Sequence, residues 1–339
     1  MFTRYDIHHT TRYLYSKPVT FGEHRVMFRP RDSHDLRVLA TDLEVSPNAA
    51  IRLIQDPHSN SVALVQPQSP ATELRIVCKF RIEHAQSHNL ELPLSPSAEL
   101  YPFAYGVEER FDLEHYLRPH YDDPQGELTR WSRQFLRTDG PTYTREMLVQ
   151  MNQFIRDHFE YGQRNEEGTQ TPLQTLALGS GTCRDFALLM MEAARRLGIA
   201  TRFVSGYLYD PALDDALTST STVTAPEPST ARTAPDEARN APAGDTPPVM
   251  AEVPTPEPVM PTVGAGSTHA WLQAYLPGAG WVPFDPTNNL LGGNQLIRVG
   301  VARDPGQAAP VTGSWYGDPE AYLGMEVKVN VRRLAPPQR

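Results

Sequence analysis

One stretch of the chain, residues 211–266, limits what the rest can fold into. It is dominated by Pro, Thr, Ala, Ser and Glu, with no aromatic residue and only scattered Val. Such a composition buries too little apolar surface to offset the conformational entropy lost on ordering. Because the cost of closing a loop rises slowly with its length, we expect a disordered insertion between two strands of one domain. A linker between two domains is the alternative interpretation.

The first 85 residues predict an all-β domain. Short segments with alternating apolar and polar residues are separated by loops rich in Pro, Asn, Asp and Ser. In the last segment Cys78 lies on the apolar side, so we interpret it as a small hydrophobic residue of the core. The predicted strands are Tyr5–Tyr15, Leu36–Val45, Ile51–Asp56, Val62–Gln66 and Glu73–Glu83.

Residues 86–140 form a less regular region. Pro-rich stretches precede a short helical pattern near Leu128–Leu136. We interpret this region as a connecting segment between the all-β domain, residues 1–85, and a second domain, residues 141–335.

The period of the apolar residues changes after Thr144, which is a candidate N-cap. Apolar residues at Met147, Leu148, Met151, Phe154, Ile155 and Phe159 mark one face of an amphipathic helix. Thr171 followed by Pro172, a cap residue before Pro at the first helical position, predicts the start of a second helix that ends at Gly179. A third begins after Thr182, with Asp185 three residues later in a capping pattern, and ends at Gly198.

Three strands are expected after these helices, at Ile199–Tyr209, Ala270–Tyr275 and Trp281–Asp285. Helices that precede strands, rather than alternate with them, indicate an α+β fold. The second domain therefore consists of a helical part packed on an antiparallel sheet, with the insertion at about 211–266 within it.

Composition excludes several classes of function. The formal net charge of −9 and the lack of a Lys/Arg cluster with interleaved aromatic residues argue against a nucleic-acid partner. No apolar run reaches the roughly 18–20 residues that span a bilayer, and the N-terminus has no secretory signal pattern. With only two cysteines, Cys78 and Cys183, we expect a cytoplasmic protein without a disulfide framework.

Cys183 is the first candidate catalytic residue. It lies at or next to the first helical position, where unpaired N–H groups and the helix dipole stabilise a thiolate. The Gly179-Ser180-Gly181 lead-in permits a sharp turn, and the Cys183 N–H can donate to an oxyanion. A structural cysteine at a helix start is the alternative.

His269 and Asp285 are the candidate base and orienting acid. They lie sixteen residues apart on two strands that form a hairpin. A symmetric turn at Gly278-Ala279 would place them on opposite faces, whereas a turn at Pro277-Gly278 with a bulge at Gly280 would place them diagonally on one face. We predict the bulged register. The alternatives are a core histidine and a turn-capping aspartate.

Three separated blocks carry a resemblance to a known family. GSGTCRDFALLMMEAARRLGIATRFVSGYLY and STHAWLQAYLPGAGWVPFDPTNN contain G-x-C at a helix start, H-A-W on a strand, and G-W followed by D-P-T. This pattern resembles the transglutaminase-like (papain-type) core over roughly residues 140–300. RYDIHHTTRYLYSKPV and EHRVMFRPR resemble the β-rich N-terminal region of bacterial members. Departures are Arg184, where Gln is common, Leu188, where His is frequent, and the long insertion.

The resemblance implies a Cys183-His269-Asp285 triad that forms a thioester from an amide of a peptide or protein substrate. Attack by water makes the enzyme a cysteine protease or amidase, which we favour, and attack by an amine makes it a transglutaminase. A catalytically silent peptide-binding adaptor is the alternative of another class. We expect no metal and no cofactor, and the oligomeric state stays open.

Three aromatic residues are weaker candidates. In this family aromatic residues near the triad shield the His–Asp pair or line the acyl channel, which suggests Trp271 and Trp281 as substrate-binding residues. Tyr161 is a candidate second oxyanion donor. For all three, packing in the core is the alternative.

Overall fold

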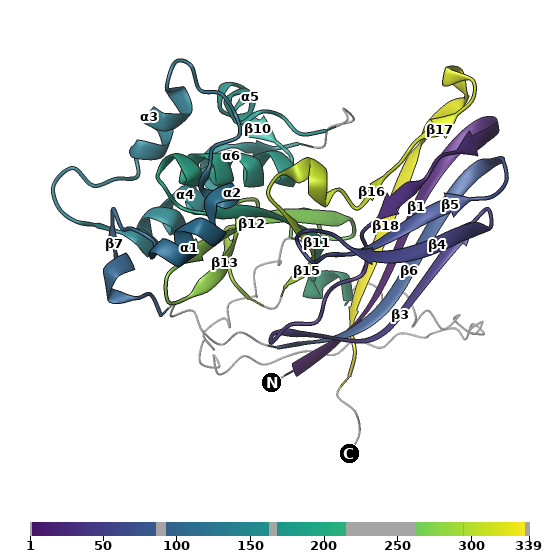
Figure 1. The fold of residues 1–339 in the computed structure, drawn as a ribbon, viewed down its shortest axis with the longest axis horizontal. Helices are drawn as coiled ribbons and strands as arrows, with labels where there is room; N and C mark the ends of the chain where they lie inside the picture. Colours follow the sequence, from purple (N-terminus) through teal and green to yellow (C-terminus); the bar gives the residue numbers. More distant parts are fainter. Residues whose placement is uncertain (1, 86–92, 163–167, 215–261, 294, 336–339) are drawn as a thin grey trace, which may run out of the picture.

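The N-terminal region consists of two antiparallel sheets (Figure 1). The computed structural model describes residues 2–85, 93–162, 168–214, 262–293 and 295–335. One sheet has the order β17-β1-β6-β3, with β18 also paired to β1, and the other has the order β16-β2-β5-β4. The strands are β1 Phe2–Phe21, β2 His24–Val26, β3 Leu36–Ser46, β4 Ala49–Gln55, β5 Ser61–Pro67, β6 Ala71–Ala85, β16 Val311–Thr312, β17 Trp315–Tyr316 and β18 Tyr322–Arg333. The prediction of an all-β N-terminal region is confirmed.

Strand β6 shows why the alternating pattern was informative. Arg75, Lys79 and Arg81 are exposed, while the apolar residues between them are buried. Cys78 is buried at 2% exposure and forms no disulfide. Its interpretation as a core residue is confirmed.

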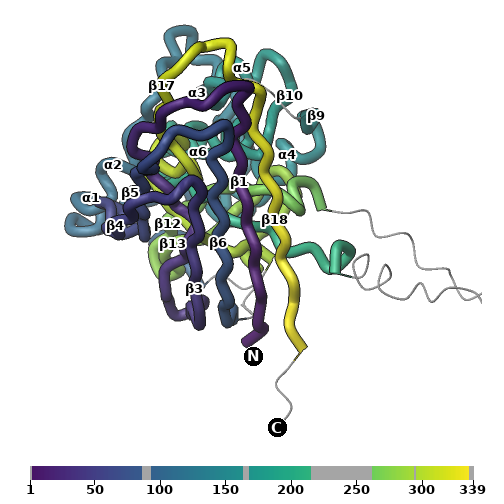
Figure 2. Tube along the Cα trace, turned by 90° about the vertical axis from the view of Figure 1, so that its right-hand side faces the viewer, coloured from purple at the N-terminus to yellow at the C-terminus, as the bar shows by residue number. Residues whose placement is uncertain are grey.

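The last strand of the described chain returns to the first sheet. Strand β18 pairs antiparallel with β1 from Tyr5 opposite Arg333 to Tyr15 opposite Tyr322. Figure 2 shows β1, β6 and β18 side by side along much of their length. The sequence analysis did not foresee this strand, because its partner lies some three hundred residues away. The N-terminal sheet is therefore completed by the C-terminal part of the chain.

Helices gather on the side of the molecule opposite the long strands of the N-terminal region, at the left of Figure 1. Helix α6 is central, and helices α3, α4 and α5 contact it. The helices are α1 Val107–Asp112, α2 Glu114–Leu117, α3 Glu127–Arg133, α4 Thr144–His158, α5 Pro172–Leu178 and α6 Cys183–Arg196, with short 3-10 helices at Pro96–Ala98, Pro305–Ala308 and Pro319–Ala321. Two short ladders join β7 Leu100–Tyr101 to β8 Thr142–Tyr143, and β9 Glu160–Tyr161 to β10 Ser180–Gly181.

The predicted helix boundaries hold with two corrections. Helix α3 ends at Arg133, before the predicted end near Leu136. Helix α4 has Tyr143 as its N-cap, so Thr144 is its first residue rather than its cap. Thr171 caps α5 by accepting a hydrogen bond from Gln174 N, and Gly179 ends the helix in the left-handed conformation at φ 61°. Gly198, at φ 75°, follows the end of α6 in the same conformation.

A further antiparallel sheet, separate from the two of the N-terminal region, supports the helices. Its order is β14-β13-β12-β11-β15, and α6 packs against β11 and β12. The strands are β11 Thr201–Leu208, β12 Thr268–Leu276, β13 Gly280–Asp285, β14 Leu290–Leu291 and β15 Leu296–Ala302. The predicted α+β class is confirmed. Of the predicted disordered insertion, residues 215–261 lie outside the described residues. The prediction is wrong at its two ends, because residues 211–214 are helical and residues 262–266 form a loop held by hydrogen bonds to Asp210, Asn288 and Val329.

A buried ion pair fastens the connecting segment to α6. Glu192 and Arg195 are both fully buried, and their side chains are 2.7 Å apart. Glu192 accepts hydrogen bonds from His120 N and Tyr121 N, while Arg195 donates to the carbonyl of Tyr116. These bonds satisfy the buried charges and hold residues 116–121 on the helix that carries Cys183.

Candidate active site

Cys183 is the first residue of α6, and its position is fixed by the residues around the helix start. Thr182 is the N-cap, and the carboxylate of Asp185 accepts hydrogen bonds from both its backbone N and its hydroxyl, at 2.8 Å each. The other Asp185 oxygen accepts from Gln170 N at 2.7 Å. A Cβ on Gly181 would lie 2.8 Å from Asp185 Cβ, so glycine is needed there for close packing. The predicted capping pattern is confirmed.

The hairpin of β12 and β13 adopts the predicted bulged register. Leu276 pairs with Gly280 and Leu272 pairs with Phe284, around a three-residue turn. Continuing this register by one residue puts Asp285 opposite Trp271, so His269 and Asp285 share a face as diagonal neighbours. Gly280 has φ 72°, which is the left-handed conformation that such a bulge requires.

His269 and Asp285 form a buried pair. His269 Nε2 lies 2.8 Å from Asp285 Oδ2, and both side chains are fully buried. The other ring nitrogen, Nδ1, is buried and has no hydrogen-bond partner in the described part of the chain. Cys183 is close enough to influence the His269 pKa, both through its charge and as a hydrogen-bonding group. The structure therefore brings all three predicted triad residues together, with Nδ1 left for the thiol.

The charges of this pair support each other. Burial opposes a charged His269, but Asp285 and Cys183 outweigh it and raise the pKa of the imidazole to about 10. Burial also disfavours the charged form of Asp285, yet hydrogen bonds from His269, Asn288 and Thr287 N lower the pKa of the carboxyl below its ordinary value. An imidazolium beside a carboxylate is thus the stable state near neutral pH.

Asp285 is held by two neighbours that the sequence analysis did not identify. Thr287 N donates to Oδ1 at 3.0 Å, and Asn288 Nδ2 donates to Oδ2 at 2.9 Å. Asp285 therefore caps the following turn with one oxygen and pairs with His269 through the other, so the two interpretations of this residue are compatible. The sequence signal that could have identified Asn288 is its position, since it carries a side-chain amide three residues after the candidate orienting acid.

Asn288 also fixes a loop that covers His269. Its Oδ1 accepts from Val263 N at 3.0 Å, and its Nδ2 donates to Val263 O at 3.1 Å. The next residue, Gly264, has φ 89°, and a Cβ there would lie 2.8 Å from His269 Nδ1. The loop Thr262–Gly266 thus lies against His269 Nδ1, the ring nitrogen that Asp285 does not bind.

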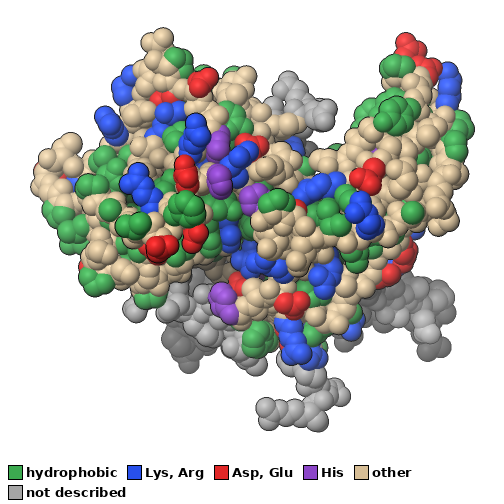
Figure 3. Space-filling view, viewed as in Figure 1, with side chains coloured by type: hydrophobic (Ala, Val, Ile, Leu, Met, Phe, Trp, Pro, Cys, Tyr) green, Lys and Arg blue, Asp and Glu red, His purple; other side chains and the backbone are tan. Residues whose placement is uncertain are grey.

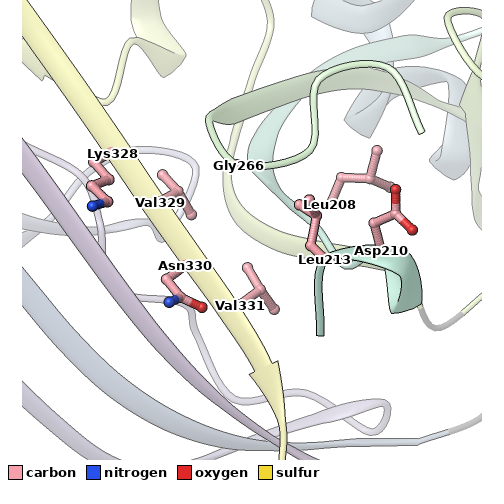
Figure 4. A pocket seen from close by; sticks show the side chains of 8 residues that line it. All are labelled: Leu208, Asp210, Leu213, Gly266, Lys328, Val329, Asn330 and Val331. Carbon is pink, nitrogen blue, oxygen red and sulfur yellow. The ribbon is translucent and has the colours of Figure 1, made fainter. Parts of the chain in front are cut away.

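Two further anchors hold this loop beside a cavity of about 320 Å³. Asp210 Oδ2 accepts from Thr262 N at 2.6 Å, and Val329 N in β18 donates to Gly266 O at 3.0 Å. In Figure 4, Val329 and Val331 extend from β18 toward Leu213 across this cavity. A strand of the N-terminal sheet therefore helps to place the loop on the candidate triad.

Family comparisons agree with this arrangement. A model of the transglutaminase-like superfamily matches residues 129–286, which include Cys183, His269 and Asp285. A model of the bacterial transglutaminase-like N-terminal region matches residues 5–83. The chain belongs to the transglutaminase-like superfamily.

Relatives of this transglutaminase-like protein have the same extent. An uncharacterized protein of Mycobacterium leprae is 24% identical over 333 residues, covering 98% of this chain and 99% of the relative. An uncharacterized protein of Mycobacterium tuberculosis is 24% identical over 335 residues, covering 97% of this chain and 92% of the relative. The two regions thus occur together in these relatives.

A solved structure shares the fold of this transglutaminase-like protein. It is that of a proposed cysteine protease from Cytophaga hutchinsonii, with a TM-score of 0.64 and 16% identity, covering 100% of this chain and 93% of the other. At this identity the similarity supports the fold alone. The predicted transglutaminase-like core with an all-β N-terminal region is confirmed.

Two of the three departures from the family pattern, Arg184 and Leu188, lie in the same helix as Cys183. Arg184 is exposed, so its side chain does not disturb the packing of the transglutaminase-like core. Leu188 is fully buried in α6, where a histidine would need a hydrogen-bond partner. Neither residue replaces a member of the triad.

The weaker aromatic candidates lie in three different places. Trp271 is buried at 1% exposure, and its ring is stacked 6.0 Å from that of His269 at 27°. Tyr161 lies near Cys183, whose charge adds to burial in raising the pKa of the phenol to about 12. Trp281 is at the far end of β13 from Asp285 and lines a different cavity.

In the parts of the chain that the structure describes, no group of three or more His, Cys, Asp or Glu residues is placed to hold a metal ion. Within the same residues, no helix is long and apolar enough to cross a bilayer.

Proposed function

We propose that this protein is a cysteine-dependent enzyme that opens amide bonds of peptides or proteins, with hydrolysis as the outcome. Cys183 is the nucleophile, His269 the base and Asp285 the residue that orients it. The observation that carries this proposal is that the two ring nitrogens of His269 have different surroundings. Nε2 is hydrogen-bonded to Asp285, whereas Nδ1 has no partner among the described residues and is left for Cys183. Triad chemistry needs this difference, because the base must be oriented through one nitrogen and exchange a proton through the other.

The proposed reaction has two steps. The Cys183 thiolate attacks the amide carbonyl, an S–C bond forms, and the C–N bond breaks as imidazolium Nδ1 protonates the leaving amine. Water then attacks the thioester, giving its proton to Nδ1 and releasing the acid and the thiolate. The steps use only side chains of this protein and the substrate.

Stabilisation of the oxyanion comes from the start of α6. The first-turn N–H groups of a helix have no acceptors inside the helix, so the Cys183 N–H is available to the oxyanion. Tyr161 is proposed as the second donor, because it lies near Cys183 and its hydroxyl has no hydrogen-bond partner among the described residues.

Transfer of the acyl group to an amine is the second candidate outcome. The same thioester gives a transglutaminase product when a primary amine reacts in place of water. A library of glutamine-containing peptides, incubated with and without methylamine and read by mass spectrometry, separates the two. Cleaved or deamidated peptides that persist with methylamine support hydrolysis, and a methylamide adduct as the main product supports acyl transfer.

The matched control for this assay is the other cysteine. Cys78→Ala should turn over peptides like the wild type, and Cys183→Ala should give no product. Absence of any product or thioester adduct with the wild type, across the library, would instead favour the peptide-binding adaptor.

We propose a reducing compartment, with the cytoplasm as the first choice, and a peptide or protein as the main partner. Both cysteines are free thiols, and a thiolate nucleophile requires that state.

A further inference from the structure

A second cavity, of about 310 Å³, lies between the connecting segment and the strands β11–β13. Each of the three strands contributes one residue to the wall of this cavity: Arg202 from β11, Tyr275 from β12 and Trp281 from β13. Its size is at the lower end of that typical for small-molecule sites. The full lining is Glu109, Asp112, Leu113, Tyr116, Arg202, Tyr275 and Trp281.

Arg202 is held in a fixed position in this cavity. Its Nε donates to Gln273 Oε1 at 2.9 Å on the neighbouring strand, and its guanidinium lies 4.1 Å above the centre of the Trp281 ring. These contacts use one N–H and one face of the group. The two terminal NH₂ groups have no hydrogen-bond partner among the described residues, so they are available to a ligand.

The fully buried Arg195 shows how a buried guanidinium is compensated elsewhere in this molecule. Its side chain lies 2.7 Å from that of Glu192, which is also fully buried. Among the described residues, no carboxylate lies within ion-pair distance of Arg202. Burial, together with the charges of Arg298 and Arg31, lowers the Arg202 pKa to about 9, so the group is still charged near neutral pH.

Two further arginines lie near Arg202 in a protein that is negative overall. Arg298 and Arg31 are near enough to Arg202 to disfavour its charge, and the net charge of the chain is −9. Figure 3 shows Lys and Arg side chains gathered near the middle of this face, between the helical part and the long strands. A desolvated cation among like charges is costly unless an anion compensates it.

The walls of the cavity are aromatic and well fixed. Tyr116 and Tyr275 contact Trp281 edge to face, with ring centres 5.1 and 5.4 Å away. The Tyr116 hydroxyl is hydrogen-bonded to His58 at 3.0 Å. A preorganised wall of this kind suits a ligand with an apolar part next to its charge.

Two carboxylates limit which anion fits. Glu109 and Asp112 line the cavity with Arg202, and Glu109 is held by the Tyr275 hydroxyl at 3.1 Å. They repel a dianion such as phosphate, whereas the planar fork of one guanidinium matches a single carboxylate in bidentate geometry.

We propose that this cavity binds the carboxylate of a short peptide, either a free C-terminus or an acidic side chain, with Arg202 as its anchor and Trp281 as its apolar wall. The proposal does not rest on the activity of Cys183, because this cavity is lined by none of the triad residues.

Binding to the full-length Cys183→Ala protein, which cannot consume peptides, tests this by calorimetry. The probes are Ac-Phe-Ala with a free C-terminus, its C-terminal amide, and Ac-Phe-Glu-Ala amide. We expect at least one carboxylate-bearing peptide to bind about tenfold or more tightly than the amide, since a charge-assisted bidentate pair is stronger than a neutral hydrogen bond. Binding of the free acid alone identifies a C-terminus, and binding of the glutamyl peptide alone identifies a side chain.

Variants separate the anchor from the general positive field. Arg202→Gln should weaken binding about tenfold or more, while Arg298→Gln, which removes the same charge outside the lining, should weaken it by less than about threefold. Equal binding of acid and amide, no binding of either acid at millimolar concentration, or an unchanged affinity in Arg202→Gln would overturn the proposal. The acid-to-amide comparison needs no change at Arg202, so it stands even if that variant does not fold.

Discussion

The two cysteines of this chain lie in two regions that bury them almost equally and treat them differently. Cys78, in β6 of the N-terminal sheet, is 2% exposed, and Cys183, at the start of α6, is 7% exposed. Burial raises the pKa of the Cys78 thiol to about 12, and the nearby Asp42 adds to this effect. Cys183 instead lies beside an imidazole held by a buried carboxylate.

The difference teaches that burial alone does not decide what a thiol can do. A sheet interior supplies apolar contacts and no partner for a charge, so Cys78 behaves as a small hydrophobic residue. A helix N-terminus with a neighbouring imidazole supplies N–H groups and a positive charge, which together stabilise a thiolate.

Replacing each cysteine with alanine sharpens this comparison most. Cys183→Ala should lower peptide turnover by about 10⁴-fold or more, because the nucleophile is lost. Cys78→Ala should leave turnover within about twofold and lower the free energy of unfolding by roughly 1–2 kcal/mol through the cavity it creates. Turnover and urea unfolding of both variants are the measurements, and loss of turnover in Cys78→Ala would break the comparison.

The loop over His269 provides a test with a built-in control. Gly264→Ala and Gly266→Ala both place a Cβ at a positive φ, 89° and 83°, but only the first meets His269 Nδ1, at 2.8 Å. We expect Gly264→Ala to slow turnover by about 100-fold, since small displacements of a catalytic group cost this much, with Gly266→Ala far less affected. Equal rates in the two variants would show that the contact with the imidazole does not matter.

Asn288 should act through Asp285 rather than on the substrate. Asn288→Ala removes a hydrogen bond to a carboxylate and two bonds to the covering loop, so turnover should fall about tenfold, or ~1.4 kcal/mol. The control is Asn289→Gly, which keeps the left-handed backbone at φ 54° and has no hydrogen bond to Asp285. The alkylation rate of Cys183, measured against pH, should shift in Asn288→Ala and not in the control.

Stability against pH tests the charged state of His269. A pKa raised from 6.5 to about 10 gives stability that is complete below about pH 6.5 and is lost as pH rises toward 10. Asp285→Asn removes the main cause of the raised value. The stability advantage of the wild type should therefore shrink by about 1 kcal/mol per pH unit between roughly pH 7 and 9. A constant difference in melting temperature over that range would contradict this assignment.

Much of the fold follows from local patterns. The alternation in β6, the capping signals at Thr171 and Thr182 and the glycines at 179 and 198 are properties of neighbouring residues, and each was predicted. The pairing of β18 with β1 depends on contacts across the whole chain, which periodicity does not encode. The same holds for the buried pair of Glu192 and Arg195 with the connecting segment.

In the candidate site, too, some features could be predicted from local sequence and others could not. The hairpin register that unites His269 and Asp285 was predicted, because the turn length and Gly280 determine it. The covering loop and its bond to β18 come from tertiary packing and left no pattern in the sequence. Trp281 resembled a triad neighbour by its motif, yet the strand carries it to the cavity of Arg202 instead.

Alkylation of the two thiols tests the central claim most directly. The full-length protein and its His269→Ala variant are treated with limiting iodoacetamide from about pH 5 to 9, and intact-mass and peptide mapping report which cysteine reacts. The account predicts rapid modification of Cys183 below pH 7, its loss in His269→Ala, and an inert Cys78 in both proteins. Slow modification of Cys183 with an ordinary thiol profile, unchanged in His269→Ala, would contradict the thiolate–imidazolium pair.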